Sequence, residues 1–352
     1  MRPLAVVAMS GGVDSSVAAA LLLEAGYRVE GVTLRLWDSA RRDDRICSDH
    51  RDAARVAAAL GIPHTLIDQR EAFERTVVGP FVAAYAAGRT PSPCVACNSE
   101  FKLGVLFDRA LERGAERVAT GHYARLGHGD GGLVLRRARD PDRDQSYFLF
   151  ALRRRQLAHI HFPLGDLTKA EVRGRAAALD LPVAAKPDSQ DLCFGDPAAL
   201  VQARGRGGGG GDVVDEAGRR LGDHVGIERF TIGQRRGLGI ASATPLYVRA
   251  LDARGARVVV GPTPPRCSSL FAREWNWLGE APREGEPVLA QIRSRQPPLP
   301  AWVRSDGEGS VRVDFARPAL AVAPGQAVVV YRADVVVGGG WIEQVSRADD
   351  AA

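Results

Sequence analysis

The chain has 352 residues, of which 45% are hydrophobic and 25% charged, so it is long enough for two or three globular domains. No uninterrupted apolar stretch approaches the length of a membrane span, so we expect a cytoplasmic protein without a membrane partner. The net charge of +5 suits a nucleic-acid partner. Lysine occurs only at Lys102, Lys169 and Lys186, however, and biased base composition explains an arginine-rich chain equally well.

The first half of the chain alternates short apolar runs with helical patterns. Strands are predicted at 4–8, 29–34, 64–67 and 117–120, and helices at 16–25, 49–60 and 102–113. This alternation predicts an α/β domain with a doubly wound parallel sheet and helices on both faces.

The pattern changes after about residue 195. Residues 204–212, RGRGGGGGD, read as a flexible linker or loop. Short β-type runs follow at 246–250, 257–260, 288–292, 311–315, 327–331 and 334–337, separated by Gly, Pro and Asp. We therefore expect a catalytic domain at 1–200 and two small β-rich domains at 212–265 and 266–347.

The first predicted strand and helix are joined by the turn SGGVDSS at residues 10–16. Backbone N–H groups and the helix dipole favour an anion at such a turn, and Gly11 and Gly12 allow a phosphate to approach closely. The turn lacks the lysine of the G-x-x-x-x-G-K-[ST] loop and the glycine spacing of G-x-G-x-x-G. It carries Asp14 instead, which suits Mg²⁺ bound to phosphates. An ordinary Gly-Gly turn is the alternative.

Five cysteines, at 47, 94, 97, 193 and 267, favour free, metal-bound or catalytic thiols over a disulfide framework. Cys94 and Cys97 have C-x-x-C spacing before a predicted helix, where a thiol pKa falls below about 8.5, so Cys97 is a candidate nucleophile. The spacing alone suits structural zinc or a redox pair equally, although no second pair of ligands completes a zinc site. Cys47 and Cys267 match no motif and are interpreted as structural.

The turn SGGVDSS resembles the pyrophosphate-binding loop of the ATP-pyrophosphatase (PP-loop) enzymes, which split ATP into AMP and pyrophosphate. Taken together, seven motifs are similar to the tRNA-specific 2-thiouridylases over nearly the whole chain: SGGVDSS, TPSPCVACN, ATGHYAR, RDQSYFL, DSQDLCF, FTIGQRRGLG and APGQAVVVY. The resemblance implies an adenine-nucleotide α-hydrolase-like (PP-loop) first domain, two tRNA-binding β domains and 2-thiolation of a wobble uridine.

The resemblance also implies ATP with Mg²⁺ as cofactor, and an ATP site made of Ala8, Met9, Ser10, Gly11, Gly12, Val13, Asp14, Ser15, Leu34 and Gly121. After adenylation of uracil O2, Cys193 would carry a persulfide from a sulfur-carrier protein or cysteine desulfurase. Its terminal sulfur would attack C2. The nucleophile Cys97 would then release the product and leave a Cys97–Cys193 disulfide or an equivalent oxidised state.

The anticodon arm of tRNA is the implied partner. By the resemblance, the target base contacts Ser92, Pro93 and Cys94, and the rest of the RNA contacts His122, Arg143, Asp144, Gln145, Arg293, Ser294 and Gln326. Without the resemblance, His122 would read as a hydrogen-bonded loop histidine and Gln326 as a turn residue.

The sequence departs from the family pattern in three places. Ser92-Pro93-Cys94 replaces Asn-Pro-Asp, Arg143 stands where lysine is usual, and residues 207–211 are five glycines. With Cys97 and Cys193, Cys94 could supply three ligands of an iron–sulfur cluster. We favour the persulfide route instead and expect no metal site made of protein groups alone.

Two other functions are compatible with parts of the sequence. A PP-loop adenylating ligase of the argininosuccinate synthetase type would have no use for Cys97 and Cys193. A non-catalytic RNA-binding protein with a redox-active C-x-x-C would have no use for Asp14 in the turn.

Overall fold

The computed structural model describes residues 2–38, 45–129, 131–188, 192–305 and 309–348. Its first domain is built on a five-stranded parallel sheet in the order β3-β2-β1-β4-β7. The strands are β1 (Leu4–Ala8), β2 (Arg28–Arg35), β3 (His64–Asp68), β4 (Arg117–Thr120) and β7 (Ile160–His161). This sheet confirms the predicted fold class of the first domain.

Helices cover both faces of this sheet because the apolar residues of β1 alternate between two cores. Ala5 and Val7 belong to the core of α1 (Val13–Glu24), α2 (Arg45–Ala59) and α7 (Lys169–Ala178). Leu4 and Val6 face the opposite core, which contains Leu106 and Phe107 of α6 (Leu106–Glu112).

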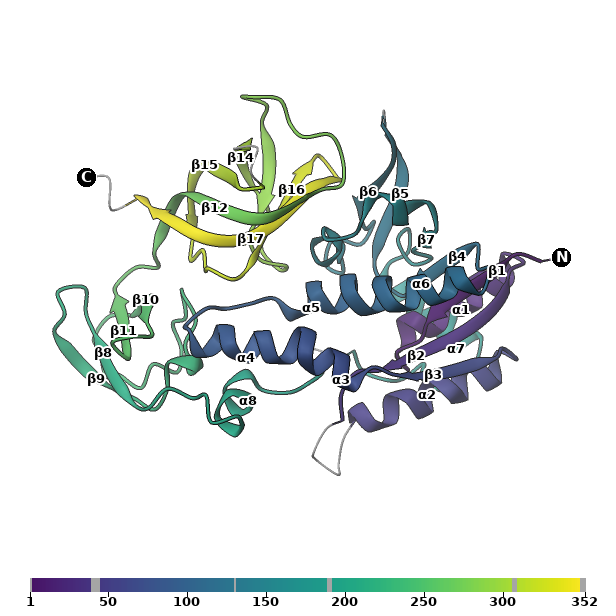
Figure 1. Ribbon diagram of the computed structural model, residues 1–352, viewed down its shortest axis with the longest axis horizontal. Helices are drawn as coiled ribbons and strands as arrows, with labels where there is room; N and C mark the ends of the chain where they lie inside the picture. Colours follow the sequence, from purple (N-terminus) through teal and green to yellow (C-terminus); the bar gives the residue numbers. More distant parts are fainter. Residues whose placement is uncertain (1, 39–44, 130, 189–191, 306–308, 349–352) are drawn as a thin grey trace.

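Two long helices each contain a π-helical segment. One runs through α3 (Arg70–Phe73), η1 (Glu74–Val78) and α4 (Gly79–Ala86), and the other through α5 (Pro93–Ala96), η2 (Cys97–Val105) and α6. They pack through Phe73 and Phe101, whose ring centroids lie 5.5 Å apart. Figure 1 shows these two helices running from the parallel sheet toward the β-rich half of the molecule. Shorter helices are η3 (Ser146–Leu149), η4 (Arg154–Ala158), α8 (Pro197–Ala203) and η5 (Ile227–Arg229).

The second half of the chain forms two β units, as predicted. A four-stranded sheet contains β8 (Gly211–Val214), β9 (Arg220–His224), β10 (Tyr247–Asp252) and β11 (Arg257–Gly261). A six-stranded barrel follows, made of β12 (Arg266–Trp277), β13 (Val288–Gln291), β14 (Leu299–Ser305), β15 (Val311–Leu320), β16 (Ala327–Arg332) and β17 (Val335–Arg347). Pairing of β12 with β17 closes the barrel.

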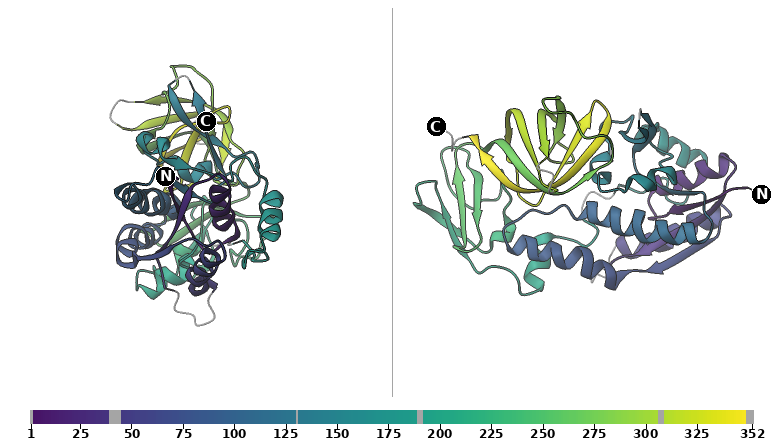
Figure 2. Two further views of the ribbon diagram at one scale, coloured as in Figure 1. Left: turned by 90° about the vertical axis from the view of Figure 1, so that its right-hand side faces the viewer. Right: turned by 45° about the horizontal axis from the view of Figure 1, so that its top comes forward.

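The barrel shares a core with the first domain. Val329 and Tyr331 of β16 lie in the same apolar cluster as Leu4 and Val6 of β1. A hairpin of the first domain, β5 (Ala124–Gly129) and β6 (Gly132–Arg137), extends the barrel sheet by pairing β6 with β17. Figure 2 shows the barrel seated beside this hairpin. The two domains are therefore held together by both apolar packing and backbone hydrogen bonds.

The predicted elements agree with the structure in type but not always in length. The strand predicted at 117–120 is β4, whereas the helix predicted at 102–113 already begins at Pro93. The glycine-rich stretch at 205–210 has no regular structure, and Gly211 begins β8. Among the described residues, no helix is both long enough and apolar enough to cross a membrane.

Candidate functional site

The turn between β1 and α1 has the features of a main-chain anion site. Gly11 has a positive φ of 71°, and the N-cap residue Gly12 gives α1 no side-chain cap. The hydroxyls of Ser15 and Ser16 donate to the carbonyl oxygen of Gly12, at 3.2 and 2.8 Å. Because the first N–H groups of a helix have no intrahelical acceptor, this turn can bind an anion through its main chain.

Gly121, which follows β4, lies directly against this turn. A Cβ at position 121 would come within 2.6 Å of the Ser15 nitrogen and 2.7 Å of the Asp14 carbonyl carbon. No side chain fits in that space, so close packing of backbone on backbone explains the glycine. Ala8, Met9 and Leu34 lie at the carboxyl ends of β1 and β2, the edge of the sheet at which this turn begins.

Asp14 is held by two partners from distant parts of the chain. Its Oδ1 accepts hydrogen bonds from the Tyr123 hydroxyl at 2.9 Å and from Lys169 Nζ at 2.7 Å. Burial and the neighbouring Asp14 carboxylate raise the pKa of Tyr123, so its hydroxyl remains a donor at neutral pH.

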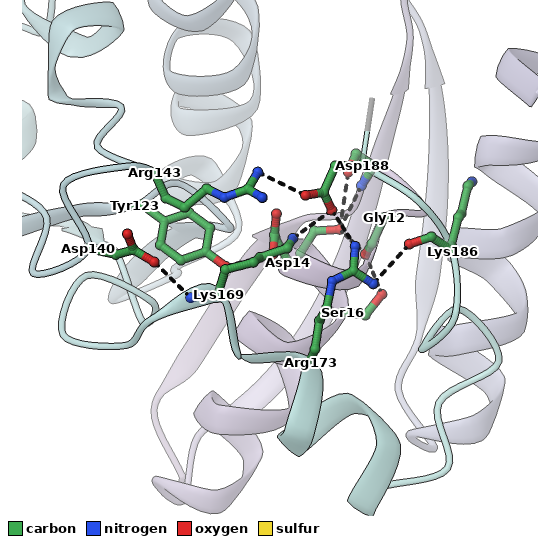
Figure 3. A network of polar contacts seen from close by, with 12 residues as sticks. Gly12, Asp14, Ser16, Tyr123, Asp140, Arg143, Lys169, Arg173, Lys186 and Asp188 are labelled. Carbon is green, nitrogen blue, oxygen red and sulfur yellow. Dashed lines mark hydrogen bonds and ion pairs between the residues drawn. The ribbon is translucent and has the colours of Figure 1, made fainter. Parts of the chain in front are cut away.

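The Asp188 carboxylate forms ion pairs with three cationic side chains. Its carboxylate pairs with Lys169 Nζ at 2.8 Å, with Arg143 at 2.9 Å and with Arg173 at 2.9 Å. Burial alone would raise the pKa of Asp188, but the Lys169 hydrogen bond and the three positive charges lower it. Figure 3 shows these side chains converging beside Asp14. Lys169 thus links Asp188 to the turn between β1 and α1.

Lys186 binds the other side of the turn. Its Nζ donates to the Gly11 carbonyl oxygen at 3.1 Å and pairs with Asp52 at 2.8 Å. Two of the three lysines of the chain therefore lie at the turn between β1 and α1.

The packing of η2 brings Cys97 close to the segment that follows Cys193. Cys97 is 8% exposed and shares an apolar cluster with Phe101 and Phe194. Phe194 fixes its segment by edge contacts with Phe81 and Trp37, with ring centroids 5.1 and 6.3 Å apart. The four cysteines whose side chains are described are free, namely Cys94, Cys97, Cys193 and Cys267, and the side chain of Cys47 lies outside the described part.

The predicted lowering of the Cys97 pKa is wrong. Burial raises the pKa of Cys97 and raises that of Cys193 to about 12, and the positive charge of Lys102 offsets this only in part. Partial desolvation also raises the pKa of Cys94, although its side chain is exposed in part. The helix begins with the single turn α5, and desolvation by the surrounding apolar side chains outweighs any effect of its dipole.

Some of the side chains predicted to bind tRNA make hydrogen bonds within the first domain. Asp144 accepts from the Ser146 hydroxyl at 3.0 Å, and Gln145 accepts from the Tyr123 N–H at 2.9 Å. His122 is 7% exposed and is hydrogen-bonded to Thr120 at 2.8 Å. Burial lowers the pKa of His122 to about 3, so its ring is neutral at neutral pH.

Other predicted tRNA contacts lie where the domains meet. Arg293 donates to the carbonyl oxygens of Ile232 and Ala321, at 2.9 and 2.8 Å. The Gln326 side chain donates to the Thr90 carbonyl oxygen at 2.6 Å, two residues before Ser92. In the segment before η2, Ser92 and Pro93 are buried and Cys94 is exposed. In the barrel, the Ser294 carbonyl oxygen accepts a hydrogen bond from the Gln291 side chain at 3.0 Å. The roles of these residues in RNA binding remain predictions.

The sequence interpretation assigned no role to Lys169, Lys186, Asp188, Tyr123 or Phe194. One signal was available, because a chain with only three lysines places two of them in this site. Their partners are up to 175 residues away, which local patterns do not reveal.

The donor groups of the site suit Mg²⁺ only together with phosphate. Among the residues that the structure describes, no three His, Cys, Asp or Glu side chains converge closely enough to hold a metal ion. Mg²⁺ is commonly bound by one or two carboxylates and the phosphates of its substrate, and Asp14 provides such a carboxylate.

Three family models match the chain in succession. Residues 4–196 match the tRNA methyl transferase HUP domain, residues 203–262 the tRNA methyl transferase PRC-barrel domain, and residues 267–342 the Aminomethyltransferase beta-barrel domain.

The relatives are similar to this chain over nearly their whole length. The tRNA-specific 2-thiouridylase MnmA of Parvibaculum lavamentivorans is 48% identical, over 96% of this chain and 90% of the relative. The protein of the same name from Geobacter metallireducens is 45% identical, over 97% of both chains. Another, from a Bradyrhizobium species, is 47% identical, over 96% of this chain and 90% of the relative.

Proposed function

Because this chain belongs to the family of tRNA-specific 2-thiouridylases, we propose that it replaces the O2 oxygen of a wobble uridine in tRNA with sulfur, at the expense of ATP. The observation that carries the proposal is the link between the two halves of the site. Lys169 joins Asp14, on the phosphate-binding turn, to Asp188, in the segment that leads to Cys193. This link supports the proposal that ATP and a sulfur-bearing thiol act on one base.

The first step is adenylation of the base. The uracil O2 attacks the α-phosphorus of ATP, the bond to the β-phosphate breaks, and pyrophosphate leaves. The first N–H groups of α1 would hold the departing anion, and Asp14 would hold Mg²⁺, which would screen the phosphate charge. The O2 oxygen thereby becomes part of a good leaving group, AMP.

The second step transfers sulfur. A sulfur carrier or cysteine desulfurase loads Cys193 with a persulfide, whose terminal sulfur attacks C2 and expels AMP. The thiolate of Cys97 then attacks Cys193 Sγ, which releases the thiolated base and leaves a Cys97–Cys193 disulfide for an external thiol to reduce. Each attacking sulfur must lose its proton, and Lys102 favours the deprotonated forms of both cysteines.

The binding of tRNA in this proposal follows the resemblance. The target base contacts the exposed Cys94 and the buried Ser92 and Pro93. Arg143 contacts the RNA nearby. The wobble base lies in a single-stranded loop, so turning it into the site costs less than extracting a paired base.

The test compares Asp14→Asn with the unchanged protein in a reaction with ATP, Mg²⁺, tRNA and a persulfide donor. Asparagine keeps an acceptor for Tyr123 and Lys169 but lacks the carboxylate that holds Mg²⁺. We expect 2-thiouridine only with the unchanged protein, and the same circular dichroism spectrum for both. If the unchanged protein adenylates a small molecule without tRNA, the ligase alternative is correct instead.

A further inference from the structure

We propose that Arg137 is a positioning residue that couples the two segments expected to hold the RNA, residues 143–145 in the first domain and residues 293–294 in the barrel. The inference rests on the proposed function, since it concerns how the same site receives the wobble base. Its basis is a chain of polar contacts that runs from Asp144 through Arg137 and Gln291 into the barrel.

The first link of this chain joins Arg137 to Asp144. Arg137 is the last residue of β6, and its guanidinium pairs with the Asp144 carboxylate at 3.3 Å. The Asp144 side chain is buried and also accepts from the N–H and the hydroxyl of Ser146, at 3.1 and 3.0 Å. A buried carboxylate is stable only with such partners. Arg137 and Ser146 therefore hold the segment at residues 143–145 in place.

The second link passes through Gln291, the last residue of β13. Gln291 is 4% exposed, and its Oε1 accepts from the Arg137 guanidinium at 2.8 Å. Its Nε2 donates to the carbonyl oxygens of Arg293 and Ser294, at 2.9 and 3.0 Å. A guanidinium has only donors, so Arg137 requires the amide to present its oxygen. The amide nitrogen must then point toward the backbone of Arg293 and Ser294.

The orientation of the guanidinium is fixed by the barrel. Arg137 lies over the ring of Tyr331 in β16, with its Cζ 3.8 Å from the ring centroid, and Tyr331 is buried. The flat contact with the ring and the two polar partners restrict the planar group to one orientation. A displacement of either RNA segment therefore disturbs the contacts that hold the other.

A purely structural role is the alternative, in which Arg137 only docks the hairpin on the barrel. The neighbouring Arg136 offers a matched control, because it also joins β6 to the barrel, through an ion pair with Asp334 at 2.8 Å. In the described part of the chain, the polar contacts of Arg136 are with Asp334 and the His128 carbonyl oxygen, and neither belongs to an RNA segment.

The test follows the wobble base directly. Saturating tRNA with 5-fluorouridine at the wobble position is added to the unchanged protein, Arg137→Lys, Gln291→Glu and Arg136→Lys, and the ¹⁹F signal of the docked base is measured. Lysine keeps the charge that Asp144 needs but lacks the planar fork that also reaches Gln291. Ionised glutamate keeps an acceptor for Arg137 but has no N–H for the two carbonyl oxygens.

We expect Arg137→Lys and Gln291→Glu each to reduce the ratio of docked to undocked base at least about 5-fold, as for one or two lost hydrogen bonds. The kcat/KM for tRNA in thiolation should fall by a similar factor. The KM for ATP should stay within about 2-fold of its original value, since the chain of contacts includes no residue of the turn between β1 and α1. Arg136→Lys should behave as the unchanged protein.

A full docked-base signal in both Arg137→Lys and Gln291→Glu, or an equal loss in Arg136→Lys, would overturn the inference and leave the proposed function standing. If Arg137→Lys does not fold, Gln291→Glu decides alone, because it leaves the pair of Arg137 with Asp144 intact. If the docked-base signal is reduced in these two variants only, but no protein thiolates tRNA, the proposed function fails while the inference stands.

Discussion

The ring of Phe194 meets the ring of Phe81 edge-on, with centroids 5.1 Å apart, and thereby anchors the residue that follows Cys193. Phe194 also meets Phe73, at 5.9 Å, and is 6% exposed. The position of Cys193, the proposed persulfide carrier, therefore depends on aromatic packing against α3 and α4, and not only on the polar contacts of Asp188.

Replacing Phe194 should affect sulfur transfer but not ATP binding. Phe194→Ala should lower the free energy of unfolding by about 3–5 kcal/mol and reduce 2-thiouridine formation, because the Cys193 segment loses its apolar support. Pyrophosphate binding should persist, because Phe194 belongs to an apolar cluster that includes no residue of the β1–α1 turn, and Phe194→Leu should restore part of the activity. An active Phe194→Ala variant with unchanged stability would show that the ring does not position Cys193.

The cysteines should divide into two groups. Cys97→Ser and Cys193→Ser should yield no 2-thiouridine, since serine can neither carry a persulfide nor form the disulfide. Cys267→Ser should remain active, because Cys267 is 2% exposed and only donates to the Ser269 carbonyl oxygen, at 3.1 Å. Mass spectrometry of nucleosides from the treated tRNA measures this. A thiolating Cys193→Ser variant would rule out the persulfide on that residue.

Lys102 should control the reactivity of the thiols. Its charge lowers the pKa of Cys94, Cys97 and Cys193 against the larger effect of burial. Lys102→Met should slow alkylation of Cys193 about 3- to 10-fold at fixed pH, because a smaller fraction of the thiol is thiolate, and Lys102→Arg should restore the rate. With a Cys193 pKa of about 12, the rate should rise steadily between pH 7 and 10. A plateau near pH 8 would contradict this assignment.

His122 should make the fold sensitive to acid. Its pKa is about 3 when folded, against 6.5 for an exposed histidine, so the unfolded chain binds the proton first. Stability should be complete above pH 6.5 and fall, by up to about 1.4 kcal/mol per pH unit, as the pH drops toward 3. Urea unfolding at pH 7, 6 and 5 should show a weaker pH dependence for His122→Gln than for the exposed control His128→Gln. Identical slopes would mean that His122 does not titrate on unfolding.

The role of Cys94 decides between a thiol-only mechanism and an iron–sulfur cluster. Cys94→Asp restores the residue type that the family pattern has at this position, so it should retain substantial thiolation. Iron content and thiolation should be measured together on anaerobically purified samples of both proteins. Stoichiometric iron in the unchanged protein, lost together with activity in Cys94→Asp, would refute the cluster-free mechanism.

Local patterns predicted the elements whose signals are local. The strand at 117–120 is a short run of β-type residues, and the structure places β4 at those positions. The helix through Cys97 was predicted to start too late, because its π-helical segment lacks the 3.6-residue period that marks an α-helix. The β5–β6 hairpin was missed, since its partner strand β17 lies about 200 residues further along the chain.

In the candidate site, too, the features with a local sequence signal were predicted and those that depend on distant residues were not. The phosphate-binding turn is one continuous motif and could be recognised from seven residues. The Asp14–Lys169 contact joins residues 155 positions apart, and the pKa of Cys97 depends on apolar side chains from several helices. Such tertiary properties have no signature within the sequence around either residue.

The central claim is that one site couples ATP cleavage to tRNA thiolation, and product stoichiometry tests it most directly. The protein is incubated with labelled ATP, Mg²⁺ and a persulfide donor, with and without tRNA, and all nucleotide and phosphate products are separated. We predict AMP, pyrophosphate and 2-thiouridine in equal amounts, and no ATP cleavage without tRNA. Formation of ADP and orthophosphate, or of AMP without tRNA, would contradict the account.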